Sequence, residues 1–324
     1  MVKSRLNIVA VTPPEAISPG KVKRNHKEEA RAKFERLWLV DPEQFNPNRN
    51  AIERERVTRT LNIMQPVFNP KDKKIVDLGC GSGVFTNYLA DRGASVDAVD
   101  IASNALKTIQ PKANINLIQD YVPHTKLKDE AYDVVLGTEI IAYLHADLYR
   151  LFFSELARLT HNQGHVVCST PLDIYAEDAL ERFVTLVETE FKVDKWQFSY
   201  HAWYIRLRRI LHAPDRFSHA MNSPDYRQKQ LNKRKGIRKH WFLFNSTKGI
   251  GFIWTGLNKL LKPTMQWLEQ SSKLLLWMEK CCRFISSESG ISHVIFVGTR
   301  RSMIDHLPAD EIPQERKHRK EVWE

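Results

Sequence analysis

Cysteine is scarce in this sequence, and long apolar runs are missing. The four cysteines are Cys80, Cys168, Cys281 and Cys282. Their spacing fits neither a disulfide framework nor a metal site, which favours a reducing, cytoplasmic environment. The longest uncharged stretches, near Gly249–Asn258, are far shorter than the ~20 residues that span a bilayer. The N-terminal segment does not resemble a signal peptide, so we expect a cytoplasmic protein.

Acidic residues are fewer than basic ones. The chain has 49 Lys and Arg against 38 Asp and Glu, a net charge of +11 and a pI of about 9.4. This balance indicates an anionic partner, such as nucleic acid, acidic lipid or an acidic substrate, although a solvated basic surface would also explain it. With 324 residues, of which 42% are hydrophobic, the chain can hold one large domain with an insertion, or two domains.

The stretch Lys73–Gly83, KKIVDLGCGSG, organises the chain. An apolar segment suited to a buried strand is followed by glycines at alternate positions, Gly79, Gly81 and Gly83, and then by a predicted helix over Val84–Arg92. Strand, glycine turn and helix form the first unit of a doubly wound α/β domain. The glycines allow the backbone to approach a ligand closely, and the helix N-terminus adds N–H donors.

An acidic residue closes the second predicted strand. This strand, Ala94–Val99, ends at Asp100, about 20 residues beyond the glycines, where a carboxylate reaches ribose hydroxyls in nucleotide-binding folds. The dinucleotide pattern requires glycine at position 84, but Val84 occupies it. The motif therefore argues against NAD.

DLGCGSG followed by this acid resembles motif I and its successor in the class I S-adenosylmethionine (SAM) methyltransferases. The resemblance implies a doubly wound, seven-stranded α/β sheet, SAM as cofactor and methyl transfer. An α/β turn without a ligand is the alternative. In that family an acid after the third strand, here Asp120, binds the adenine amino group, with the neighbouring Tyr121 along the ring. Thr138 and Glu139, after the fourth strand, would face the methionine part of the cofactor.

A second resemblance concerns the N-terminal region. Phe45–Arg49, together with Lys33–Glu35 and Asp41–Glu43, is similar to the N-terminus of the ubiquinone-precursor (polyprenyl-hydroxybenzoate) O-methyltransferases. Their arginine contacts the SAM carboxylate, which implies this role for Arg49; a surface arginine is the alternative. The full set of SAM-binding residues that the two resemblances imply is Arg49, Asp77, Gly79, Gly81, Gly83, Asp100, Ile101, Asp120, Tyr121, Thr138 and Glu139.

The acceptor side departs from those relatives. They often carry Glu-x-x-Glu-His after the fourth strand. This chain keeps the first glutamate as Glu139, but Ala142 replaces the second glutamate and Tyr143 replaces the histidine. One carboxylate, with His145 nearby, is too few ligands for a hard metal ion, so we expect no metal. A hydroxyl acceptor needs a base to remove its proton, and Glu139, Tyr143 and His145 are the candidates.

The last two strands of the core are far apart in the sequence. The sixth is predicted at Lys192–Phe198 and the seventh only at Ser292–Gly298, so roughly 90 residues replace a hairpin loop. A separate module after residue 200 is the alternative to an insertion. The predicted organisation is a flexible tail (1–27), a helical cap (28–66) that contains a helix over Ala51–Met64, a SAM-binding core (67–200), a helical insertion (201–291), the last core strand (292–303) and a charged tail (304–324).

The predicted insertion is basic and aromatic. Arg227–His240 contains no acid, and Trp241, Phe242 and Phe244 follow it. Amphipathic helices, predicted to be separated at Pro263, come next. This composition suits an anionic membrane surface or an apolar-tailed substrate, or else a lid packed on the core. Nucleic-acid binding lacks a recognisable motif. His201, His212 and His219 are expected to be ordinary surface or core residues.

We therefore expect a SAM-dependent methyltransferase that acts on a small or lipid-like acceptor, with oxygen as a candidate atom. It would be cytoplasmic or peripheral at the inner face of a membrane. Methylation of RNA or protein through the basic insertion, and SAM binding without transfer, are the alternative functions. The pattern does not define the oligomeric state.

Overall fold

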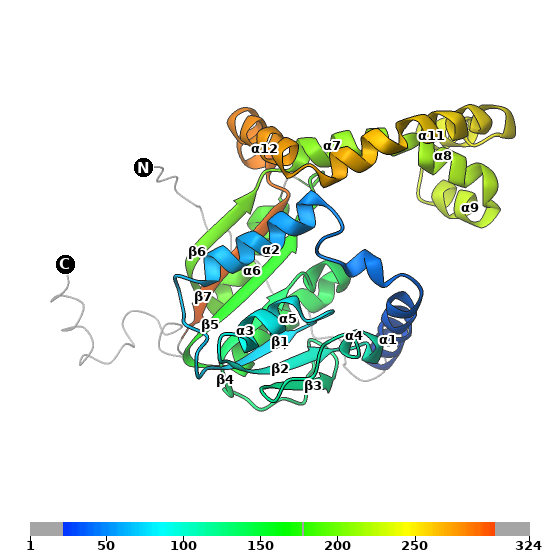
Figure 1. Ribbon diagram of the computed structural model, residues 1–324. Coiled ribbons are helices and arrows are strands. Elements are labelled where there is room, and N and C mark those ends of the chain that lie inside the picture. Colours follow the sequence, from blue (N-terminus) through cyan, green and yellow to red (C-terminus); the bar gives the residue numbers. More distant parts are fainter. Residues whose placement is uncertain (1–21, 177, 302–324) are drawn as a thin grey trace, which may run out of the picture.

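The structure is a computed structural model that describes residues 22–176 and 178–301 (Figure 1). Seven strands form one sheet in the order β3-β2-β1-β4-β5-β7-β6. β7 runs antiparallel between β5 and β6, and the other neighbouring pairs are parallel. This arrangement confirms the predicted fold class. The strands are β1 (Lys74–Leu78), β2 (Ser95–Asp100), β3 (Ile115–Gln119), β4 (Tyr132–Thr138), β5 (Thr160–Pro171), β6 (Phe191–Ser199) and β7 (His293–Arg300).

The strand order reverses at β1, which pairs with β2 on one side and with β4 on the other. Ile75, Val76 and Leu78 of β1 have no exposed surface, because helices cover both faces of a parallel sheet. At such a switch point the connections from neighbouring strands leave in opposite directions and open a crevice beyond the carboxyl ends of the strands. The glycine loop follows β1 directly and lies at this crevice.

Helices cover both faces of the sheet. One apolar cluster joins α2 (Ala51–Met64) and α3 (Val84–Ala90) to one face, and another joins α5 (Tyr149–Leu159) and α6 (Ala179–Glu190) to the other. α4 (Ser103–Leu106) packs against β2 and β3, and α1 (Val22–Val40) packs against α4 (Figure 1). Residues 22–27, expected in the tail, already belong to α1, because the helix extends into the basic run. The remainder of that tail and the charged tail lie outside the described residues.

The segment between β6 and β7 is a helical insertion. It comprises α7 (Ala202–Leu211), α8 (Ala213–Asn222), α9 (Pro224–Asn232), α10 (Ile237–Asn245), α11 (Lys248–Gln270) and α12 (Ser272–Ser286). Because β7 returns to the sheet between β5 and β6, the segment interrupts the domain and is not a separate module. Pro263 lies inside α11, so the predicted break there is wrong. No helix among residues 22–176 and 178–301 is long and apolar enough to cross a membrane.

A largely, but not fully, buried ion pair connects the insertion to the core. Arg59 of α2 donates from its two terminal nitrogens to the carboxylate oxygens of Glu279 in α12, at 2.7 and 2.5 Å. Glu279 also accepts the backbone N–H of Tyr200, at 3.0 Å. Arg59 donates in addition to the Ser199 hydroxyl, at 3.1 Å. Helix α2, the β6–α7 junction and α12 are thereby joined at one point.

Candidate active site

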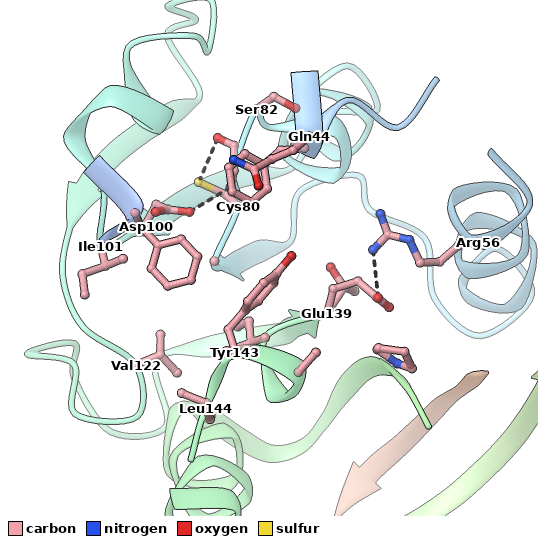
Figure 2. A pocket seen from close by; sticks show the side chains of 18 of the residues that line it. Gln44, Arg56, Cys80, Ser82, Asp100, Ile101, Val122, Glu139, Tyr143 and Leu144 are labelled. Carbon is pink, nitrogen blue, oxygen red and sulfur yellow. Dashed lines mark hydrogen bonds and ion pairs between the residues drawn. The ribbon is translucent and has the colours of Figure 1, made fainter. Parts of the chain in front are cut away.

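A cavity of about 540 Å³ opens beyond the carboxyl ends of β1, β2 and β4 (Figure 2). The core contributes the glycine loop and the residues that follow β2, β3 and β4. The N-terminal helices contribute Trp38, Phe45 and Arg56, and α7 of the insertion contributes Ile205. All three parts of the fold therefore enclose one space, which lies where doubly wound sheets bind their ligands.

The three glycines of the loop all have positive φ, at +61°, +54° and +75° for Gly79, Gly81 and Gly83. This conformation disfavours residues with a Cβ atom. A Cβ on Gly79 would also lie 2.8 Å from Cγ1 of Ile140, and one on Gly83 would lie 2.8 Å from Cγ1 of Ile109. The loop therefore needs glycine both for its path and for its close packing, and it exposes backbone to the cavity.

Asp100 is fixed at the end of β2 by two backbone donors. Its Oδ2 accepts the N–H of Gly81 at 3.0 Å, and its Oδ1 accepts the N–H of Ala102 at 2.9 Å. Burial raises the pKa of Asp100 despite these hydrogen bonds. A carboxylate has about four acceptor positions, so free positions remain for hydroxyl donors. Ile101, the next residue, also lines the cavity.

Asp120 and Tyr121 lie on the same wall, after β3. Both are buried and line the cavity. The Asp120 carboxylate accepts the backbone N–H of Tyr121 at 2.8 Å and that of Lys126 at 2.7 Å, which orders the loop between them. The structure thus brings Asp100, Asp120 and Tyr121 together, as the sequence indicates.

Asp77 lies below the glycine loop, in β1. It is buried, and the Thr86 hydroxyl donates to its Oδ2 at 2.6 Å. Burial raises the pKa of Asp77 to about 7, although the hydrogen bond from Thr86 opposes this shift. Asp77 lines the cavity two residues before Gly79, the first glycine of the loop.

Glu139, directly after β4, is held as an anion. Its Oε1 accepts the Ser169 hydroxyl at 2.7 Å and contacts Nε2 of His293 at 2.6 Å, while Arg56 lies 3.3 Å from Oε2 (Figure 2). Burial alone would raise the pKa of Glu139, but His293 and Arg56 outweigh it and lower the pKa to about 2. Glu139 has φ +64°, a strained conformation common at functional sites. A carboxylate so strongly stabilised as an anion is a poor proton acceptor, so Glu139 does not fit the predicted role of base.

The other two predicted bases differ in environment. Tyr143 is half exposed, with its ring edge against Phe34 at 5.3 Å between centroids. Burial and the nearby Glu139 raise the pKa of Tyr143, so its hydroxyl stays protonated at neutral pH and is a poor base. His145 lines the cavity. The described part of the chain contains no cluster of three or more His, Cys, Asp or Glu side chains that could hold a metal ion.

Arg49 lies outside the cavity, and Arg56 lies inside it. Arg49 is exposed before α2, whereas Arg56 lines the cavity and pairs with Glu53 and Glu139. Arg56 lies on the predicted helix Ala51–Met64, whereas Arg49 precedes that helix, and no sequence pattern singled out Arg56. His293 was missed because no motif surrounds it; only the position of β7 beside β5 brings it to Glu139.

The strand order, the glycine loop after β1 and the carboxylates after β2 and β3 define a class I SAM-dependent methyltransferase domain. Residues 75–164 match the family model described as "Methyltransferase domain". The chain therefore carries a methyltransferase domain of this class, the cofactor of which is SAM.

Curated relatives resemble this domain in part. The chain is 32% identical over 133 residues to a ubiquinone biosynthesis O-methyltransferase of Bartonella tribocorum, which covers 39% of this chain and 53% of the relative. It is 31% identical over 133 residues to a ribosomal protein L11 methyltransferase of Campylobacter fetus; the match covers 40% of this chain and 46% of the relative. The chain spans about half the length of these relatives. Among solved structures, N-methyltransferase NodS of Bradyrhizobium japonicum shows 17% identity and a TM-score of 0.41, covering 54% of this chain and 88% of NodS.

Proposed function

We propose that this protein transfers a methyl group from SAM to a small or lipid-like acceptor, with a hydroxyl oxygen as the receiving atom. The observation that carries the proposal is the single cavity that extends from Asp100 and Asp120 to Glu139 and Ile205. Its volume of about 540 Å³ falls within the ~300–1,000 Å³ typical of small-molecule sites. Such a cavity allows a cofactor and an acceptor to lie in one enclosure.

The residues present suit the cofactor. Asp100 would accept the ribose hydroxyls, Asp120 would accept the adenine amino group, and Gly79 and Gly81 would admit the methionine part close to the backbone. Bound SAM supplies a methyl group that is already activated as part of a sulfonium. The protein therefore has to align the acceptor behind this methyl group and exclude water.

The acceptor end of the cavity combines apolar walls with a fixed polar group. Phe34, Leu144, Pro171 and Ile205 line it and suit an apolar or aromatic acceptor, as the name of the ubiquinone relatives suggests. Glu139 is too strongly stabilised as an anion to remove a proton, and we assign it to positioning. His145, which lines the same cavity, keeps the predicted role of proton acceptor.

We further propose that the protein works at the surface of an anionic membrane. The basic run Arg227–His240 supplies positive charge, and Trp241 and Phe244 beside it are exposed. Phe242, by contrast, is buried in a small core of the insertion, with the Arg234 guanidinium 4.2 Å from its ring centroid. The run therefore offers charge and two aromatic side chains to a partner.

Calorimetry with SAM, S-adenosylhomocysteine and NAD tests the cofactor assignment. We expect low-micromolar affinity or better for SAM, and no heat with NAD, since Val84 occupies the third glycine position of the dinucleotide motif. Absence of heat with both SAM and its demethylated product would refute the proposal.

Methyl transfer needs a separate assay, with SAM labelled in its methyl group. Lipid and metabolite extracts, RNA and ribosomal protein L11 should be compared as acceptors. Label in an organic-soluble product is the expected result. Label in RNA or L11 would favour the macromolecular alternative, and SAM binding without any labelled product would indicate a binding protein.

A further inference from the structure

Helices α11 and α12 carry apolar side chains on two different sides. The inner side packs on the rest of the protein through Met265 and Leu268 of α11 and through Leu275 and Cys282 of α12, all of which are buried. A helix that only covers a core needs a single apolar stripe. A second, exposed stripe therefore requires its own explanation.

The exposed stripe of α11 has a regular spacing. Ile253, Leu260 and Trp267 follow one another at intervals of seven residues, and Phe252 precedes them; their exposed fractions range from 63% to 76%. Seven residues are nearly two helical turns, so these side chains share one side of the helix. At 100° per residue this side lies away from Met265 and Leu268.

The exposed stripe of α12 alternates cations with aromatic rings. Lys273, Trp277, Lys280 and Phe284 are spaced by four, three and four residues, which places them on one side of the helix. Trp277 is 63% exposed and Phe284 is 90% exposed. Leu276 is also exposed and lies on this side.

The charges of the two helices are segregated. Their acidic residues are Glu269, which Arg208 and His212 hold at 2.9 Å, and Glu279, which Arg59 holds. Both acids are thus engaged by residues of other elements. The cations of the two helices whose side-chain exposure is described are exposed to solvent: Lys259, Lys262, Lys273, Lys280 and Arg283.

We propose that these two exposed stripes, formed by Phe252, Ile253, Leu260 and Trp267 of α11 and by Lys273, Trp277, Lys280 and Phe284 of α12, dock on an anionic lipid bilayer. Tryptophan, phenylalanine and lysine on one helical face form the pattern of helices that lie in the membrane interface. The absence of free acids on the two helices matches a negatively charged surface. A second copy of the same stripes would instead bring like charges together.

The two helices that carry these stripes are linked to the cavity through α7. Both α11 and α12 pack against α7 (Figure 1), which contributes Ile205 to the cavity wall. Docking through these helices would thus place α7, one wall of the cavity, on the side of the protein that carries the bilayer contact. This inference rests on the proposed function only for the identity of the acceptor, because docking itself does not depend on methyl transfer.

Sedimentation with vesicles of phosphatidylcholine containing about one-third phosphatidylglycerol tests the proposal. The full chain should bind these vesicles, and binding should persist when the salt concentration is raised to about 1 M, because buried rings are not screened. The triple variant Trp267→Ser, Trp277→Ser, Phe284→Ser should lose vesicle affinity by at least about tenfold. The matched control is Leu39→Ser with Val40→Ser, two exposed apolar residues of α1, which should bind as the wild type does.

Fluorescence with brominated lipids provides a second measurement that does not depend on the triple variant. Lipid bromine should quench part of the wild-type tryptophan fluorescence, and Trp277→Phe should reduce this quenching. The proposal would be overturned if the triple variant bound vesicles as the wild type does, or if lipid bromine quenched no fluorescence. It would also be overturned if the wild type formed a dimer that the triple substitution abolished. RNA binding that depends on the same three rings would overturn it as well. Calorimetry with SAM on each variant reports failure of the proposed function separately.

Discussion

Glu279→Gln probes the ion pair that fastens the insertion to the core. The substitution keeps the shape of the side chain but removes the charge that Arg59 contacts through two hydrogen bonds, at 2.7 and 2.5 Å. Removing one partner of a buried pair typically costs ~3–5 kcal/mol. Arg59 retains Glu55 at 3.4 Å and the Ser199 hydroxyl at 3.1 Å, so we expect a loss of about 2–3 kcal/mol in the free energy of unfolding.

Urea unfolding followed by circular dichroism measures this loss. Glu269→Gln is the matched control, since that pair with Arg208 is more exposed and should cost less than about 1 kcal/mol. Arg59→Met combined with Glu279→Leu should recover part of the loss, because neither Arg59 nor Glu279 is then left as an unpaired charge, although Glu55 and the Tyr200 N–H each lose a partner. Equal stability of the two Glu→Gln variants would refute the reasoning.

The same pair predicts a dependence on pH. Burial opposes ionisation of Glu279, but His201 and Arg59 hold its pKa well below the usual value of 4.5. The ionised carboxylate therefore stabilises the folded state fully above about pH 4.5, and this contribution is lost as the pH falls toward the lowered pKa. Glu279→Gln should remove this part of the acid destabilisation, which unfolding at several pH values can measure.

Three further predictions concern the cavity. Asp100→Ala should weaken SAM binding by at least about tenfold, or 1.4 kcal/mol, measured by calorimetry; unchanged affinity in a folded variant would place the ribose elsewhere. EDTA should leave turnover intact, because Glu139 is already paired and Ala142 and Tyr143 provide no further ligands; loss of activity that magnesium restores would contradict this expectation. The pKa of Asp77 is raised to about 7, so the folded protein keeps a proton that the unfolded chain releases near pH 4. The free energy of unfolding of the wild type should therefore fall as the pH rises from about 4 to 7, by up to about 4 kcal/mol. Asp77→Asn should abolish that fall, and an identical pH profile for the variant would show that the carboxyl ionises normally.

The sequence was sufficient to predict where the residues of the candidate site lie in the fold when local patterns determine their positions. The glycine loop, Asp100 and Asp120 are each defined by the end of one strand, and parallel strands bring those ends to one edge of the sheet. The helix over Ala51–Met64 was predicted with the bounds that α2 has in the structure, because its periodicity and the following Pro66 are local signals.

The remaining features depend on non-local packing. The packing of α2 on the sheet brings Arg56 to Glu139, whereas Arg49, expected to contact the SAM carboxylate, lies before this helix. His293 joins them only because β7 returns beside β5. The exposed rings of α11 and α12 were not predicted, since a helix with two apolar sides does not reveal from its sequence which side packs. Pro263 was expected to end a helix, but α11 continues through it.

The position of β7 has a consequence for synthesis of the chain. β5 and β6 leave the ribosome before the insertion, and both lack their antiparallel partner until residues 293–300 have followed. During that interval each presents an unpaired strand edge, which is prone to association with other chains. The insertion helices emerge before the sheet can close. We therefore expect nascent chains that stop short of His293 to aggregate, whereas chains released after Arg300 can complete the core.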